Sequence, residues 1–191
     1  MHPKMFVVAG PPGGGKSTVF PVPTFGVDSF NADDRAAQLN QGSYLDIRPG
    51  IREQVNRIFE AFVTNHIARR ASLAFETSLR SAITFDQADE ARRAGFVVEM
   101  RYIALHTFAL HVERVRMRAD AGGHSAPVAR LREIYEASLA NLARAIHEMD
   151  FIHVYDNSRF GGAPTLLLQA ARGQVVYHAE RLPDWLVRAL S

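Results

Sequence analysis

The most informative stretch of the sequence is a glycine-rich run near the amino terminus. It reads Gly10-Pro11-Pro12-Gly13-Gly14-Gly15-Lys16-Ser17-Thr18 and matches the pattern G-x-x-x-x-G-K-[ST]. Glycines in this pattern let backbone N–H groups converge on phosphate oxygens, which side chains would prevent. The run therefore predicts a nucleotide-phosphate site, with ATP as the nucleotide, formed by Gly10, Gly13, Gly14, Gly15, Lys16, Ser17 and Thr18.

Two side chains of this run have distinct expected roles. Lys16 should contact the β- and γ-phosphates, and the Ser17 hydroxyl should hold Mg²⁺. The run follows Met5 to Ala9, an apolar segment typical of a central parallel strand, which is the context that the motif requires. Pro21 and Pro23 should end the following helix after about one turn.

Several other functions of phosphate loops are excluded or disfavoured. A GTPase needs an Asn-Lys-x-Asp element, and the only lysines are Lys4 and Lys16, so that element is missing. A large ATP-driven motor is disfavoured by the chain length and by the lack of a strand ending in Asp-Glu; Asp156 is interpreted as a strand-end residue. A small kinase is the simplest remaining class, and it needs a base and mobile cations near the γ-phosphate.

A candidate for the base lies shortly after a second expected strand end at Phe25 to Asp28. The segment Asn31-Ala32-Asp33-Asp34 offers two carboxylates, one of which could accept the proton of an acceptor hydroxyl. The alternative is that Asp33 caps a helix.

Arginines are the candidates for the cations. Arg114, Arg116 and Arg118 precede Gly122-Gly123-His124, and Arg130 and Arg132 follow it. Two arginine-bearing helices around a glycine pair are typical of a closing lid, expected over 107–148, and arginine neutralises a transferring phosphoryl group well. His111, Arg114 and Arg118 share one helical face. The alternative is a solvated basic face.

Another candidate site follows the expected strand Ser72 to Glu76. Glu76 to Ser78 should emerge at its carboxyl end, where open α/β sheets bind ligands. Arg80 could meet an acidic substrate. A surface turn and a solvated arginine are the alternatives.

Strands and helices alternate along the chain, which predicts an α/β fold with a mainly parallel sheet and a single domain over 1–191. Apolar spacing predicts further strands at 96–105 and 151–155, a hairpin from 166–169 and 175–177, and helices at 49–70, 83–94, 107–119, 128–148 and 183–190.

Composition narrows the class of protein. The 191 residues are 47% apolar and include no cysteine, which excludes disulfides and thiol catalysis. We find no signal-like or membrane-spanning run, so we expect a soluble cytoplasmic protein. The net charge of +2 gives little reason to expect nucleic-acid binding.

These motifs together resemble the zeta toxin family of phosphate-loop kinases over Met5 to about Ser158. The shared pieces are the glycine-rich run, Asn31-Ala32-Asp33, Phe75-Glu76-Thr77, Arg114-Val115, Arg118, Gly122-Gly123-His124-Ser125-Ala126-Pro127, Tyr135, Ser138-Leu139, Asn141-Leu142 and Asn157-Ser158. The sequence departs from the family at Ser78, where a second threonine is common, and at Ile134, where an arginine is common.

The resemblance implies a three-layer phosphate-loop kinase fold and transfer of phosphate from ATP-Mg²⁺ to a hydroxyl of a nucleotide sugar, such as UDP-N-acetylglucosamine. It implies Asp33 as the base, Glu76 and Thr77 in the substrate pocket, and an antitoxin protein as partner. Arg118 and Arg132 match the arginines on the transferred phosphate, with Arg130 as the alternative to Arg132.

Two other functions stay open at this point. One is a kinase of polynucleotide 5′-hydroxyls, although no basic segment interleaved with aromatic residues supports it. The other is a nucleotide-dependent interaction module without catalysis.

Overall fold

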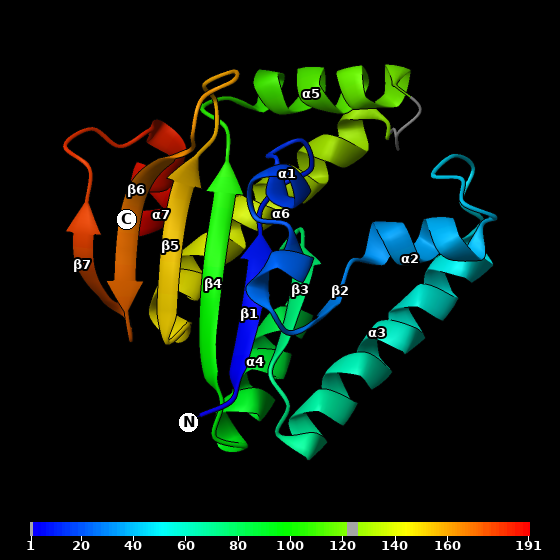
Figure 1. The fold of residues 1–191 in the computed structure, drawn as a ribbon. Helices are drawn as coiled ribbons and strands as arrows, with labels where there is room; N and C mark the ends of the chain where they lie inside the picture. Colours follow the sequence, from blue (N-terminus) through cyan, green and yellow to red (C-terminus); the bar gives the residue numbers. More distant parts are fainter. Residues whose placement is uncertain (1, 122–125) are drawn as a thin grey trace.

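A seven-stranded sheet forms the centre of the computed structural model, which describes residues 2–121 and 126–191. The strand order is β2-β3-β1-β4-β5-β6-β7 (Figure 1). Strands β1 to β5 pair in parallel, whereas β6 and β7 are antiparallel, so the sheet is mainly parallel, as predicted. The strands are β1 (Lys4–Ala9), β2 (Asp28–Phe30), β3 (Leu73–Thr77), β4 (Val97–Ala104), β5 (Phe151–Asp156), β6 (Thr165–Ala171) and β7 (Gln174–His178).

The long helices begin and end within a few residues of their predicted bounds. They are α3 (Pro49–Arg69), α4 (Ile83–Arg93), α5 (Phe108–Asp120), α6 (Val128–Glu148) and the shorter α7 (Asp184–Leu190). Helix α1 (Lys16–Val19) ends after one turn ahead of Pro21, also as predicted. Within the described ranges, no helix is long and apolar enough to cross a membrane.

Alternating side chains of β1 show how helices cover both faces of the sheet. Met5 and Val7 belong to the larger core, which includes residues of α3, α4, α6 and α7. Val8 belongs to a smaller core on the other face, with Val22 and Phe25. In Figure 1, α4, α6 and α7 lie behind the sheet, and α1 and the 3₁₀ helix η1 (Val22–Phe25) lie in front. The expected three layers are present, and the front layer is the smaller.

The segment between β1 and α3 differs from the prediction. The strand expected to end at Phe25 to Asp28 instead begins at Asp28, and η1 precedes it. The fixed φ of Pro21 and Pro23 favours this tight turn over an extended strand. Helix α2 (Ala32–Leu39) was not predicted because its residues are mainly polar or small. It is stabilised at its start by Asn31, whose Oδ1 accepts hydrogen bonds from the N–H groups of Asp33 (3.0 Å) and Asp34 (3.3 Å).

The carboxyl ends of the parallel strands share one edge of the sheet. The glycine-rich loop follows β1 at this edge, and α5 crosses it at the top of Figure 1. Thr107 starts α5 as expected, since its Oγ1 accepts from the N–H of Leu110 at 3.4 Å. Ligands bind at this edge in open α/β sheets.

Candidate active site

The glycine-rich loop leaves a set of backbone donors free. The N–H of Gly14 donates to the carbonyl of Pro11 at 3.2 Å, and the N–H of Thr18 donates to Gly15. Within the part of the chain that the structure describes, four other N–H groups of the loop find no acceptor; they belong to Gly13, Gly15, Lys16 and Ser17. Unpaired backbone N–H groups need a partner, and phosphate oxygens are suitable acceptors at a helix start.

Close packing explains why this loop needs glycine. Gly13 and Gly15 have φ values of +78° and +94°, which residues with side chains rarely adopt. A Cβ atom at Gly13 would lie 2.6 Å from the carbonyl oxygen of His111 on α5, and one at Gly15 would collide with the amide nitrogen of Asn157. The loop is therefore enclosed by α5 and by the segment after β5.

The Lys16 side chain lies inside this loop. Its Nζ donates to the carbonyls of Gly10 (2.8 Å) and Pro11 (3.2 Å). Burial lowers the pKa of Lys16, Glu76 and Asp33 counteract this by attraction, and Arg118 lowers the pKa further by repulsion. Three other predicted site residues, Glu76, Asp33 and Arg118, come from separate elements and lie close enough to Lys16 to influence its pKa.

Glu76, at the carboxyl end of β3, faces Ser17. The Ser17 hydroxyl donates to Oε2 of Glu76 at 3.1 Å. Burial raises the pKa of Glu76, while Lys16 and the bond from Ser17 lower it. The other oxygen, Oε1, is buried and has no hydrogen-bond partner among the described residues. The carboxylate thus keeps one acceptor oxygen for a further ligand.

This pair of oxygen-bearing side chains fits Mg²⁺. Magnesium prefers oxygen ligands and is commonly bound through one or two protein groups, with water and substrate phosphates completing its shell. The unpartnered Oε1 of Glu76 beside the Ser17 hydroxyl matches that requirement. The described ranges contain no group of three or more His, Asp or Glu side chains that could hold a metal by themselves.

Asp33 lies near a cluster of arginines. Its Oδ1 is 3.8 Å from Nη1 of Arg52 on α3, and about half of its side chain is exposed. Burial lowers the pKa of Arg80, and so does repulsion from Arg130 and Arg52. Asp33 therefore borders a region into which α3, α6 and the loop after β3 each place an arginine.

The loop that carries Arg80 is held in place by buried contacts. Thr77 Oγ1 accepts from the N–H of Leu79 at 3.1 Å, and Asn141 on α6 donates to the carbonyl of Leu79 at 2.9 Å. Leu79 itself is fully buried with φ of +55°, a conformation that surrounding structure must enforce. Thr77 thus lies at the predicted place, where it shapes the turn towards Arg80.

Arg132 lies on another side of α6. Its guanidinium is 4.2 Å from the centre of the Phe108 ring, and Nη1 is 3.7 Å from Glu136. It lines a pocket of about 580 Å³ together with Tyr135 and Trp185. Unlike Arg118, it is not among the groups that shift the pKa of Lys16. The predicted lid residues Gly122, Gly123 and His124 lie outside the described residues.

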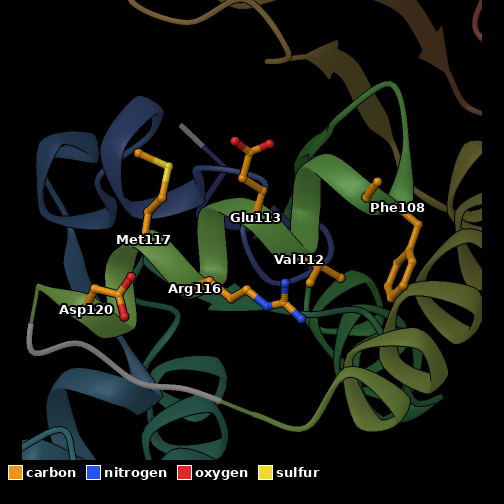
Figure 2. A pocket seen from close by; sticks show the side chains of 7 residues that line it. Phe108, Val112, Glu113, Arg116, Met117 and Asp120 are labelled. Atoms are coloured by element: carbon orange, nitrogen blue, oxygen red, sulfur yellow. The ribbon is translucent and has the colours of Figure 1, made fainter.

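A further pocket, of about 390 Å³, lies along α5 and contains none of the predicted site residues (Figure 2). Its lining side chains alternate along the helix with those that face the phosphate loop. They belong to Phe108, Ala109, Val112, Glu113, Arg116, Met117 and Asp120. Arg116 therefore lies apart from Lys16, although it belongs to the same arginine run as Arg118.

Sequence reasoning named two further residues, His111 and Asn157, but gave neither a contact with the phosphate loop. His111 is 2% exposed, and its Nδ1 lies 2.7 Å from the carbonyl oxygen of Pro12. Asn157 donates from Nδ2 to the carbonyl of Gly14 at 3.0 Å. The sequence placed His111 on a face with Arg114 and Arg118, but no spacing reveals a contact across 99 positions.

Known protein families and curated protein sequences give no match to the chain. Solved structures do match. A chain of the AvrRxo1-ORF1:-ORF2 complex with ATP superposes with a TM-score of 0.69 at 15% identity, over 91% of this chain and 60% of that chain. The protein therefore spans less than two thirds of that relative's length.

Two more solved structures share the fold. The PezAT chromosomal toxin–antitoxin system of Streptococcus pneumoniae gives a TM-score of 0.63 at 16% identity, over 97% of this chain and 76% of that chain. A protein of Chloroflexus aurantiacus assigned as a kinase gives a TM-score of 0.56 at 16% identity, over 71% of this chain and 79% of that chain. The predicted α/β phosphate-loop fold is thus confirmed, and it is shared with a protein of a toxin–antitoxin system and with a chain assigned as a kinase.

Proposed function

We propose that the protein is an ATP-dependent kinase that phosphorylates an alcohol group of a small molecule. The observation that carries the proposal is the meeting of the free N–H groups of the loop, Lys16, the Ser17–Glu76 pair and Asp33 at one sheet edge. A protein that only binds a nucleotide needs the loop alone. Phosphate transfer also needs a base, such as Asp33, close to the acceptor hydroxyl.

Each residue has a role in the proposed reaction. Lys16 leaves the carbonyls of Gly10 and Pro11 to bind the β- and γ-phosphates, and Arg118 offsets the charge of the moving phosphoryl group. Ser17 and Glu76 would hold Mg²⁺, which neutralises phosphate charge when bound. Asp33 accepts the proton of the acceptor hydroxyl while a P–O bond forms to the acceptor and the bond to ADP breaks.

The acceptor that we propose is a nucleotide sugar such as UDP-N-acetylglucosamine, and the supporting feature beside the family resemblance is charge. Arg80, Arg52 and Arg130 give the acceptor side of Asp33 a positive character that suits an anionic substrate. Glu76 and Thr77 would border it. A cytoplasmic location, where ATP and Mg²⁺ are available, and an antitoxin protein as partner belong to the same proposal. The AvrRxo1 structure holds ORF1 together with ORF2, and PezAT is a toxin–antitoxin system.

Transfer of a labelled phosphate tests this function. The protein is incubated with Mg²⁺, γ-labelled ATP and either UDP-N-acetylglucosamine or a bacterial metabolite extract, with Lys16→Ala as the control. We expect a labelled sugar nucleotide that is missing with the control. Label on an added oligonucleotide instead would indicate a polynucleotide kinase. Bound ATP without any labelled product would indicate an interaction module.

A further inference from the structure

We propose that His111 and Asn157 are positioning residues that shape the phosphate loop for ATP, each by holding one of its carbonyl groups. The proposal rests on the proposed function only in assuming that ATP is the ligand of the loop. It concerns two residues that come from α5 and from the segment after β5, far from the loop in sequence.

His111 connects the loop with the end of β4. Its Nε2 accepts a hydrogen bond from the backbone N–H of Leu105 at 3.0 Å. The proton of the neutral ring is therefore on Nδ1, which donates to the carbonyl of Pro12 at 2.7 Å. Burial lowers the pKa of His111 to about 4, and repulsion from Lys16 and Arg114 also lowers it, so the ring stays neutral at ordinary pH.

Asn157 makes the second contact that fixes the phosphate loop. Its Nδ2 donates to the carbonyl of Gly14 at 3.0 Å, and its own position is fixed on both sides. Its N–H donates to the carbonyl of Ala104, at the end of β4, at 2.9 Å. Its carbonyl accepts from Arg114 on α5 at 2.7 Å. Asn157 is 8% exposed, so these contacts are shielded from water.

Peptide geometry connects these two contacts with phosphate binding. The C=O and N–H of a trans peptide unit point in opposite directions. Holding the Pro12 carbonyl towards His111 turns the N–H of Gly13 away from α5, and holding the Gly14 carbonyl does the same for the N–H of Gly15. Both N–H groups are among those without an acceptor in the described ranges. The two side chains therefore orient the N–H groups of Gly13 and Gly15, two of the unpaired donors of the phosphate loop.

The same contacts tie the loop to the arginine that faces it. His111 and Arg114 hold the loop and Asn157, and Arg118, one turn further along α5, lies close enough to influence Lys16. His111 therefore fixes the distance between the phosphate loop and Arg118, in addition to the orientation of the loop. A change at His111 should affect ATP more than the acceptor, which binds on the side of Asp33.

The test compares ATP affinity and kinetics of matched variants. His111→Phe keeps a ring of similar shape but removes both hydrogen bonds, and His111→Gln restores a group that donates and accepts. We expect His111→Phe to raise Kd and KM for ATP-Mg²⁺ about five- to tenfold, with KM for the acceptor unchanged, because the lost hydrogen bond to the Pro12 carbonyl, the one that holds the loop, is worth roughly that factor. His111→Gln should recover part of the affinity. The exposed His147 of α6 provides the control, His147→Phe.

The outcomes separate this proposal from the proposed function. If the wild-type protein does not bind ATP, the proposed function fails. If it binds ATP and folded His111→Phe binds within twofold of it, the positioning role is wrong. A drop in kcat at unchanged KM would indicate only a loss of folded protein and would also contradict the role. Should His111→Phe not fold, Asn157→Ala gives the same test through the Gly14 carbonyl, with the same expected rise in Kd.

Discussion

At the scale of single residues, the contacts separate two adjacent carboxylates that the sequence could not separate. Tyr44 donates from its hydroxyl to Oδ1 of Asp34 at 2.8 Å, so that carboxylate already has a partner on its own side of α2. Asp33 instead influences Lys16 and lies beside Arg52. Both carboxylates act on Glu76, but only Asp33 also acts on Lys16, which supports the proposal that Asp33 meets the acceptor.

Asp33→Ala should lower kcat by at least about 100-fold, because a positioned base contributes roughly that much or more, and should leave ATP affinity nearly intact. Asp34→Asn should keep most of the activity. Steady-state rates and an ATP titration of both variants check this. Wild-type turnover of Asp33→Ala would remove Asp33 from the mechanism.

Glu76 gives a prediction about stability and pH. Because its folded-state pKa is raised, mainly by burial, its ionisation opposes folding once the pH exceeds the model-compound value of 4.5. Below that pH the carboxyl is protonated in both states and the penalty disappears. Glu76→Gln should therefore raise the melting temperature at pH 8 by more than at pH 4.5.

The same substitution should cost function, since Gln offers Mg²⁺ a weaker ligand than a carboxylate. Thermal melts at both pH values, with and without ATP-Mg²⁺, separate the two effects. Ligand should stabilise the wild type more than Glu76→Gln. A variant that loses stability as the pH rises relative to wild type would contradict the burial of this charge.

At the scale of elements, helix α6 separates two arginines that the sequence left as alternatives. Positions two apart are roughly 200° apart around an α-helix, so Arg130 and Arg132 cannot face the same ligand. Arg132 lies over Phe108, whereas Arg130 lies close enough to Arg80 to lower its pKa. The contacts favour Arg130 as the second arginine of the site.

We expect Arg130→Ala to lower kcat/KM at least about tenfold, equivalent to ~1.4 kcal/mol of transition-state binding, and Arg132→Ala to change it less than threefold. Removing Arg132 should instead lower stability slightly, since the stack on Phe108 is lost. Rates and melting temperatures of the two variants check this. The reverse order of rates would support the family-based assignment of Arg132.

Elements with strong local signals were predicted from the sequence, and those that depend on distant contacts were not. The apolar β1, the glycine run and the long α3 and α6 follow directly from residue type and spacing. Helix α2 has little apolar periodicity, and its Asn31 cap was not recognised as a helix start. His111 was placed on a helical face with Arg114 and Arg118, and Asn157 belongs to a piece shared with the zeta toxin family, but neither signal points to a contact with the loop, because their partners are far away in the sequence.

At the scale of the whole molecule, one sheet edge collects contributions from several parts of the chain that lie far apart in the sequence. The loop after β1, Glu76 of β3, α2, α5 and the segment after β5 all meet there. Parallel strand order explains this convergence, because every parallel strand delivers its following loop to the same edge. The sequence predicted the edge correctly, but the front layer of α1 and η1 is smaller than a full third layer.

Calorimetric titration of the folded protein with ATP in the presence of Mg²⁺ tests the central claim most directly, because every proposed role depends on a triphosphate held by the loop around Lys16. We predict heat from a single site with one ATP per chain, and an affinity at least about tenfold weaker, or ~1.4 kcal/mol, for Lys16→Ala. The absence of any binding heat with the wild-type protein, or equal affinity of the two proteins, would contradict the account.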